Sequence, residues 1–224
     1  MLAMSLAYAV ARGKDFLGHP TNGNYYNSVL YIQTEMPEWL VADRLAKLLA
    51  AGDDIQSPLV SAEKGIYQFD FKALKLGINL SFLWPDHKNL TKDIEEAIRK
   101  TLPTLIIIDP LYSFTSSDLV ANSEVQPLLY WLDSIKETSD SMMDEPTSLV
   151  VVHHNAKASK VSAGKAMLGS VFLHGWAEAA WYVSPRKDGI LINREFRAYP
   201  PLYPITCQFD IKRPGQFGYT LKAK

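Results

Sequence analysis

Three short segments of this sequence place chemically capable side chains directly after apolar runs. They are Thr34-Glu35-Met36-Pro37, Asp109 at the end of Thr104–Ile108, and His153-His154-Asn155. A carboxylate at the end of a buried strand needs a partner, and Mg²⁺, held directly or through water, is one such partner. A second carboxylate in a phosphate site can orient or deprotonate the attacking water. Asp109 is therefore a candidate metal ligand and Glu35 a candidate base.

Each segment also has a plain structural interpretation, which the residues alone leave open. Asp109 can cap the turn before Pro110, and Glu35 can be a first-turn glutamate favoured by the helix dipole. His153 and His154 can hydrogen-bond a γ-phosphate and sense its loss, or they can be a satisfied structural pair. Zinc is the weaker interpretation, because adjacent histidines on a strand point to opposite faces. The order along the chain, strand-Glu, strand-Asp and strand-His, favours function.

The elements that must position these side chains alternate between helix and strand. Helical stripes predict helices over residues 2–11, between Pro37 and Gly52, over 90–98 and from Ser123 to Ile135. Apolar runs predict strands over residues 28–33, 66–71, 78–84, 104–109 and 148–153, with short strands and turns after Ala177. This alternation predicts an α/β fold: a mostly parallel sheet covered by helices on both faces, with C-terminal antiparallel strands. Ligands of such sheets bind at the carboxyl ends of the strands.

Composition limits the class of protein. A chain of 224 residues with 47% hydrophobic residues is expected to form one domain over residues 1–224. The net charge of −1 gives no general attraction to nucleic acid or membrane, so any polyanion site must be a local basic patch. The single cysteine, Cys207, excludes an internal disulfide and fits a reducing compartment such as the cytoplasm. No apolar run reaches the roughly 20 residues that span a bilayer.

In this order, the segments resemble the RecA/DnaB-like P-loop ATPases, and most closely the plasmid- and phage-type replicative helicases of the RepA kind and related AAA-domain ATPases. The resemblance runs from Leu2 to about Asp210. Residues 2–18 are similar to the helix and turn that follow the family's phosphate loop. Tyr31–Glu35 is similar to the strand with the catalytic glutamate, Leu105–Pro110 to the Walker B strand, and Val151–Lys157 to the His-His-x-x-Lys sensor segment.

The resemblance implies ATP and Mg²⁺ as cofactors and a role for each matching residue. Asp109 would hold Mg²⁺, and Glu35, His154 and His153 would be catalytic. The residues expected to contact the nucleotide of a neighbouring subunit are Arg194, Arg197 and Lys157. Those expected to contact single-stranded DNA are Lys160, Lys165, Gly169 and Ser170. The basic loop from Ala156 to Gly169 also fits an ordinary solvated loop, and we expect Trp176 and Trp181 to be core residues rather than stacking platforms.

Some positions depart from the family pattern. Leu168 stands where an arginine often precedes Gly-Ser, and Arg194 and Arg197 are three residues apart instead of two. The sequence also contains no Gly-x-x-x-x-Gly-Lys-Ser/Thr phosphate loop. Two explanations remain open: a truncation, with Met1 or Met4 an internal methionine used as a start, or a natural loss of hydrolysis. We favour truncation, and in either case we expect ATP turnover by this chain to be defective.

Three functional hypotheses follow. The first is the ATPase core of a DNA helicase or recombination motor of phage or plasmid DNA, working as a homo-oligomeric ring or filament. The second is a non-catalytic module on the same scaffold, which binds single-stranded nucleic acid or a motor subunit. The third is another α/β enzyme with an aspartate at a strand end, such as a phosphotransferase, which would need a phosphate-binding loop that the sequence does not contain.

Overall fold

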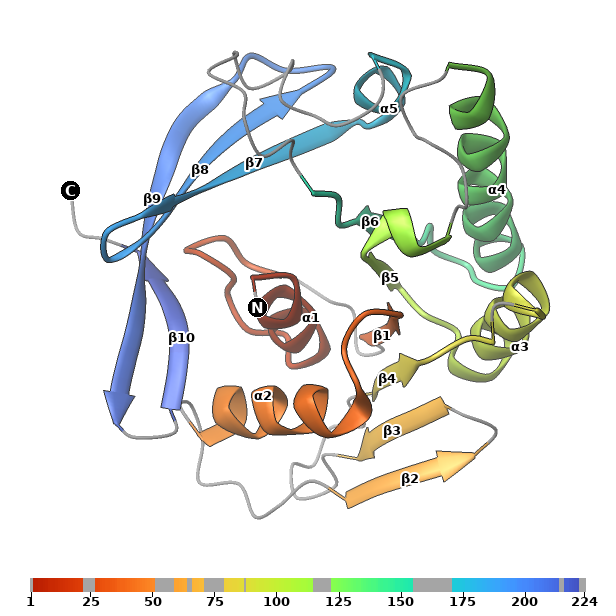
Figure 1. The fold of residues 1–224 in the computed structure, drawn as a ribbon, viewed down its shortest axis with the longest axis horizontal. Helices are drawn as coiled ribbons and strands as arrows, with labels where there is room; N and C mark the ends of the chain where they lie inside the picture. The colour runs from red at the N-terminus through yellow and green to blue at the C-terminus, as the bar shows by residue number, and fades with distance from the viewer. Residues whose placement is uncertain are drawn as a thin grey trace.

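The protein folds into two sheets with helices packed between and around them (Figure 1). The computed structural model describes residues 2–21, 27–50, 59–63, 66–70, 79–86, 88–114, 122–154, 171–213 and 216–221. The helices are α1 (Leu2–Ala11), α2 (Glu38–Ala50), α3 (Leu90–Thr101), the 3₁₀ turn η1 (Leu111–Phe114), α4 (Asn122–Asp140) and α5 (Val171–Trp176). The strands are β1 (Ser28–Gln33), β2 (Leu59–Glu63), β3 (Ile66–Asp70), β4 (Asn79–Leu83), β5 (Leu105–Asp109), β6 (Ser148–Val151), β7 (Ala179–Arg186), β8 (Gly189–Phe196), β9 (Leu202–Arg213) and β10 (Gln216–Leu221).

The larger sheet has the strand order β2-β3-β4-β1-β5-β6. Its strands β4, β1, β5 and β6 run parallel, and β2 and β3 add an antiparallel edge. This confirms the predicted α/β fold with a mostly parallel sheet. Strand β2 was missed by the sequence analysis, in the stretch where the apolar pattern is least regular. In the pairing of β1 with β5, Tyr31 lies opposite Ile107 and Gln33 lies opposite Asp109.

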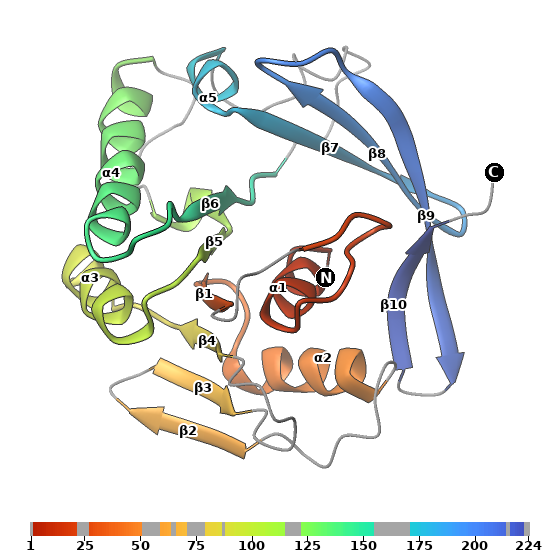
Figure 2. The same ribbon diagram turned by 180° about the vertical axis from the view of Figure 1, so that it is seen from behind.

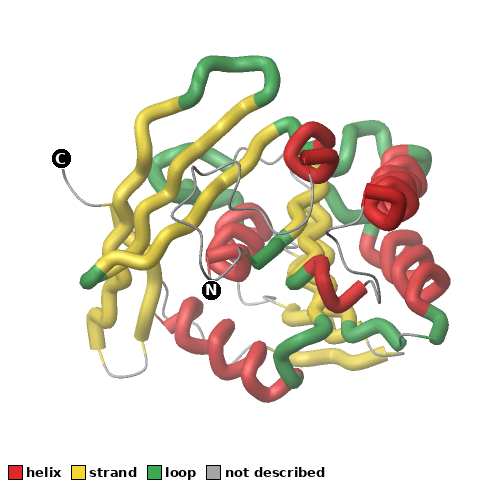
Figure 3. The backbone as a smooth tube through the Cα atoms, turned by 45° about the horizontal axis from the view of Figure 1, so that its top comes forward, coloured by secondary structure: helices red, strands yellow, loops and turns green. Residues whose placement is uncertain are grey.

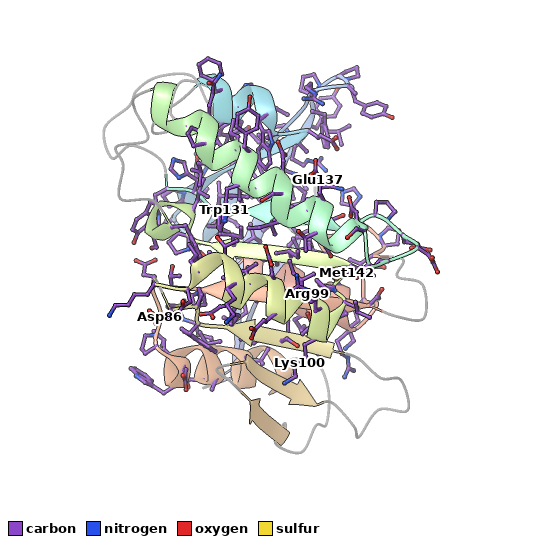
Figure 4. The ribbon with its side chains drawn as sticks, turned by 90° about the vertical axis from the view of Figure 1, so that its right-hand side faces the viewer. Asp86, Arg99, Lys100, Trp131, Glu137 and Met142 are labelled. Atoms are coloured by element: carbon purple, nitrogen blue, oxygen red, sulfur yellow. The ribbon has the colours of Figure 1, made fainter. Side chains whose placement is uncertain are left out.

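Helices cover both faces of the parallel part of this sheet. On one face, α1 and α2 pack on residues such as Tyr31 and Ile107. On the other face, α3 and α4 pack on residues such as Leu30 and Ile106. Figure 4 shows this second face with α3 and α4 next to each other, and Trp131 of α4 donates its indole N–H to Thr91 Oγ1 at 3.2 Å. Burial on both faces explains why β1 and β5 are apolar at nearly every position.

The smaller sheet is antiparallel, with the order β10-β9-β8-β7, and this confirms the predicted C-terminal antiparallel strands. Helix α1 lies between the two sheets, as Figures 1 and 2 show from opposite sides. Ala9 of α1 packs with Ile192 of β8 and Ile205 of β9, while Met4 and Tyr8 pack against the parallel sheet. Figure 3, which draws the backbone as a tube with strands in yellow, shows the two sheets as separate layers. The first helix thus joins both halves of the core.

The predicted core positions of the two tryptophans hold in part. Trp176 is half-buried, and its indole N–H donates to Asp133 Oδ1 at 2.8 Å. Trp181, in contrast, is 38% exposed on the edge strand β7 and stacks on Phe16 with 6.1 Å between ring centroids. Because β7 is the edge of its sheet, it has a neighbouring strand on one side only, and Trp181 stays partly exposed although it packs on Phe16, so the expectation of a core position for Trp181 was wrong.

The direction of α1 follows from how the helix ends. Gly13, with a φ of 58°, follows the end of the helix, because glycine is the residue that best adopts this left-handed conformation. A Cβ on Gly13 would lie 3.7 Å from Asn27 Nδ2, just before β1 begins. Because α1 ends where β1 begins and packs along it, the N-terminal turn of α1 points toward the carboxyl ends of the parallel strands.

None of the described helices is long and apolar enough to cross a bilayer.

Candidate active site at the carboxyl edge of the parallel sheet

Asp109 ends β5 and lies on the face of the sheet that α1 covers. Successive strand residues alternate between faces, so Asp109 follows Leu105 and Ile107, both of which pack in the α1 core. The side chain is half-buried, and its Oδ2 accepts a hydrogen bond from the phenol of Tyr31 on β1. Burial raises the pKa of Tyr31 well above its ordinary value, and Asp109 raises it further. The phenol is therefore protonated at neutral pH and acts as the donor.

The chain beyond Asp109 is attached to the end of β6. The N–H of Leu111 donates to the carbonyl of Val152 at 2.8 Å, and the N–H of Val152 donates to the carbonyl of Ile108, also at 2.8 Å. The Asp109–Pro110 peptide bond is cis. These bonds bring η1 next to the segment that carries the two histidines. The ends of β5 and β6 therefore form one continuous edge of the site.

Glu35 lies on a tight turn that is organised by one buried amide. Gln33 is 1% exposed, and its Oε1 accepts the backbone N–H groups of Thr34, Glu35 and Met36 at 2.9, 2.8 and 3.1 Å. The carbonyl of Met36 in turn accepts the indole N–H of Trp84 at 2.8 Å. This arrangement holds the backbone at Glu35 in place while its side chain remains 52% exposed. A fixed backbone with an exposed carboxylate suits a group that must reach a ligand.

His154 and Tyr112 complete the edge around Glu35. Nε2 of His154 lies 3.9 Å from Oε2 of Glu35, and the rings of His154 and Tyr112 have centroids 5.3 Å apart. Burial raises the pKa of Tyr112, and its hydrogen bond to Glu35 raises that pKa further. The structure thus brings Glu35, Asp109 and His154 to one edge of the sheet, as the sequence predicted. His153, half-buried, precedes His154 on the segment after β6.

The residues at this edge fit one magnesium ion that is shared with a phosphate ligand. Among the described residues there is no group of three or more His, Cys, Asp or Glu that could enclose a metal. Mg²⁺ usually keeps several waters and binds through one or two carboxylates together with substrate phosphates. With Oδ2 of Asp109 taken by Tyr31, the second oxygen of that carboxylate is left for such an ion. The α1 N-terminus, which has no acidic residue in its first turn, points toward the same edge and favours an anion there.

The two arginines predicted to act across a subunit interface lie on the other sheet. Arg194 of β8 is only 9% exposed; its guanidinium donates to the carbonyl of Tyr203 at 2.7 Å and contacts His19 Nε2 at 3.2 Å. Arg197 is exposed and donates to the carbonyl of Gly175 at 3.3 Å. Neither arginine has a described contact with Glu35, Asp109 or His154. A role in a neighbouring subunit's site stays a prediction for both.

The remaining predicted contacts fall outside the described residues, which omit 155–170. They are Lys157, Lys160, Lys165, Gly169 and Ser170.

The sequence analysis missed three residues that organise the site. Tyr31 and Gln33 are, with Ser28 at its start, the polar positions of an otherwise apolar strand, and that contrast was the signal available for them. Tyr112 had no comparable signal, because its place beside His154 depends on how η1 attaches to β6. All three act on the side chain or the backbone of a predicted residue. They are therefore part of the site even though the motif does not contain them.

Comparison with known proteins agrees with this architecture. A family model described as an AAA domain matches residues 1–160, a range that contains Glu35, Asp109 and His154. Among solved structures, the crystal structure of a KaiC-like protein from the hyperthermophilic archaeon Pyrococcus horikoshii superposes with a TM-score of 0.50. That superposition covers 89% of this chain and 77% of the other, at 11% sequence identity, so the similarity concerns the fold. Among curated proteins, no match was found.

Proposed function

Because this chain belongs to the AAA domain family and has the fold of a RecA-like ATPase core, we propose that it binds ATP and Mg²⁺ at the carboxyl edge of its parallel sheet, as part of a DNA helicase or recombination motor. One observation supports the site most directly. Glu35, Asp109 and His154 come from three different strand ends, and the fold places them at one edge, with 3.9 Å between Glu35 and His154.

Each of these side chains has a distinct chemical task in the proposed reaction. A bound Mg²⁺ would neutralise charge on the phosphates of ATP. The free oxygen of Asp109 would hold this ion or one of its waters. Glu35, on its fixed turn, would orient the attacking water and accept its proton. His154 lies within reach of Glu35 and would respond to loss of the γ-phosphate by changing its contact with that carboxylate.

The proposal includes a second subunit. The exposed fractions of Arg194 and Arg197 indicate which of these two side chains could contact the nucleotide of that subunit. In a ring or filament, a basic side chain from a neighbouring copy would contact the phosphates at Glu35 and Asp109. Arg197 is exposed, whereas the guanidinium of Arg194 is enclosed by Tyr203 and His19. We therefore expect Arg197 to be the residue that acts in trans and Arg194 to hold β8 against the start of β9.

The sequence lacks the usual phosphate loop, so the test has two stages. Without that loop, this chain should hydrolyse ATP poorly. A version with a strand and a Gly-rich loop ending in Lys-Thr joined ahead of Leu2 should gain Mg²⁺-dependent turnover. In that version, Glu35→Gln should reduce kcat at least about 10²-fold, the usual size of a general-base effect, with little change in nucleotide affinity. Glu38→Gln, which alters an exposed glutamate three residues away, is the matched control.

Two results would contradict the proposal. The loop-bearing protein could stay inactive although it is folded, or Glu35→Gln could leave turnover at the Glu38→Gln level. Either result would mean that the strand-end carboxylates do not form a hydrolytic site.

A second function is supported by the surface of the antiparallel sheet. Tyr199, between β8 and β9, and Tyr203, near the start of β9, are 74% and 84% exposed. Arg197, which follows β8, and Trp181 of β7 are exposed on the same sheet. Exposed aromatic rings with a cation are the groups that bind single-stranded nucleic acid without sequence preference. A non-catalytic module of this kind would bind single-stranded DNA in a salt-dependent manner with no ATP turnover in the loop-bearing protein. Absence of DNA binding at low salt would count against both functions.

A further inference from the structure

Tyr31 is an unusual residue for the centre of a parallel sheet. Its side chain is fully buried, yet it carries a hydroxyl group that must find a hydrogen-bond partner to be tolerated there. The phenol donates to Oδ2 of Asp109, which lies on the neighbouring strand, 78 residues later in the sequence. A phenylalanine would fill the same space without this requirement. The hydroxyl therefore has a use that packing does not supply.

The ring of Tyr31 is fixed by an aromatic row that extends to the Glu35 turn. Its centroid lies 5.2 Å from that of Phe82, and the Phe82 ring lies 6.1 Å from that of Trp84. The indole N–H of Trp84 then donates to the carbonyl of Met36 at 2.8 Å, in the turn that presents Glu35. Tyr31 thus contacts one carboxylate of the site directly, and it packs on the row of rings that supports the other.

A hydrogen-bond donor on one oxygen of a carboxylate changes how that carboxylate can bind a metal ion. An aspartate with both oxygens free can bind an ion through either or both of them. With Oδ2 engaged by the Tyr31 phenol, Oδ1 is the oxygen of Asp109 that is better able to bind an ion, and the plane of the carboxylate is set by a side chain that is fully buried. Outer hydrogen bonds of this kind commonly change metal affinity 10–100-fold, because they orient the ligand.

We propose that Tyr31 is a positioning residue for Asp109: it holds Oδ2 so that the carboxylate meets a magnesium ion, or a water of that ion, through Oδ1 alone. This inference rests on the proposed function, since it assumes that Asp109 faces the metal of a Mg²⁺–nucleotide complex. It adds a residue outside the strand-end motif. It also predicts that the chain binds the metal through a single oxygen of Asp109.

The test uses the full chain, with Mn²⁺ as the metal and ADP as the nucleotide. Tyr31→Phe keeps the ring and removes only the hydroxyl. Titration of the Mn²⁺–ADP complex with protein, followed by the enhancement of water proton relaxation, should show the half-saturating protein concentration rise about tenfold in Tyr31→Phe. Tyr182→Phe is the matched control, because Tyr182 is a second buried tyrosine on a different sheet. Its midpoint should equal that of the wild type, and circular dichroism should show that all three proteins are folded.

A second measurement detects the hydrogen bond between Tyr31 and Asp109 itself and does not depend on ATP hydrolysis. With carbon-13 at Cζ of the eleven tyrosines, the signal lost in Tyr31→Phe identifies Tyr31. That signal should shift in Asp109→Asn, and Mn²⁺ with ADP should broaden it in the wild type but not in Asp109→Asn at the same concentration. The absence of a shift in Asp109→Asn would overturn the contact, even if Tyr31→Phe failed to fold.

The outcomes separate this inference from the proposed function. If Tyr31→Phe binds Mn²⁺ with the wild-type midpoint while Asp109→Asn does not bind it, the positioning role is wrong and the metal site stands. If Mn²⁺ with ADP neither binds the wild type nor broadens the Tyr31 signal, both are wrong.

Discussion

The two sheets of this molecule expose their side chains very differently. All six residues of β1 in the parallel sheet are buried, whereas only Tyr182 among the eight residues of β7 in the antiparallel sheet is buried. A strand that is covered on both faces can carry polar chemistry only where it ends, and Glu35 and Asp109 lie at such ends. A strand with a less covered face can also carry polar side chains along its length, as Asn193, Arg194 and Glu195 of β8 do. The type of sheet therefore decides where a site can form.

We expect the two sheets to differ most in how far an alanine substitution lowers the free energy of unfolding. Ile107→Ala in β5 removes a fully buried side chain from a strand packed on both faces, and it should lower the free energy of unfolding by about 2–5 kcal/mol. Val183→Ala on β7 changes a side chain that is 37% exposed, and it should change that free energy by no more than about 0.5 kcal/mol. Urea denaturation of both variants, followed by circular dichroism, measures the two values.

Equal losses from these two substitutions would break the comparison. They would show that the antiparallel sheet is covered in solution, by a second copy or another partner, and that its exposure is not the state of the assembled protein.

A smaller effect should follow from Gln33→Leu, which tests how the end of a buried strand is organised. The substitution keeps the approximate size of the side chain and removes the oxygen that accepts three consecutive backbone N–H groups. Loss of a hydrogen-bond acceptor beside partly buried donors costs about 1–3 kcal/mol. Amide hydrogen exchange should also quicken at Glu35 and Met36, because their N–H groups lose their partner.

The control for Gln33→Leu is Gln126→Leu, at an exposed position of α4. A Gln33 variant as stable as this control, with unchanged exchange at Glu35, would mean that the backbone of the turn is held by Trp84 and the helix that follows.

The positions of the candidate catalytic residues could be predicted from the sequence because they depend on local patterns. Asp109 ends an aliphatic run and Glu35 follows another, and the rule that parallel strands end at one edge brings them together. The hydrogen bond from Tyr31 could not be predicted in this way. It depends on the register that sets Gln33 opposite Asp109, and register arises from packing across 78 residues of chain.

The antiparallel sheet was predicted with less detail for a related reason. Its strands carry large apolar side chains on both faces, as the exposed Trp181 and the buried Tyr182 show, so a residue type says little about which face it occupies. Trp181 was expected in the core on the basis of its size, but it lies exposed against Phe16. Arg194 was expected to be available to a neighbouring subunit, and its burial behind His19 depends on the loop after α1. Contacts between distant segments decide both cases.

The smallest predicted effect on stability concerns residues 141–147, which connect α4 to the edge strand β6. Asp140, the last residue of α4, accepts hydrogen bonds from the Thr147 N–H at 2.7 Å and from Lys136. Burial works to raise the pKa of Asp140, but these hydrogen bonds outweigh it and lower the pKa below its ordinary value of 3.8. A carboxyl whose pKa is lower in the folded state stabilises the protein above its unfolded pKa, and this contribution is lost as the pH falls through the folded value.

Asp140→Asn should therefore destabilise the protein at pH 7 by no more than about 1 kcal/mol, because the Lys136 side chain is 41% exposed and solvent screens the pair. The difference from the wild type should shrink below about pH 4 and vanish at lower pH, where Asp140 is protonated in both states. Asp144→Asn, at an exposed site in the same connection, should show no such dependence. If the loss in Asp140→Asn is the same at pH 7 and pH 3, the aspartate acts through its shape and its bond to Thr147. The attachment of β6, and with it the position of His154, would then be insensitive to charge.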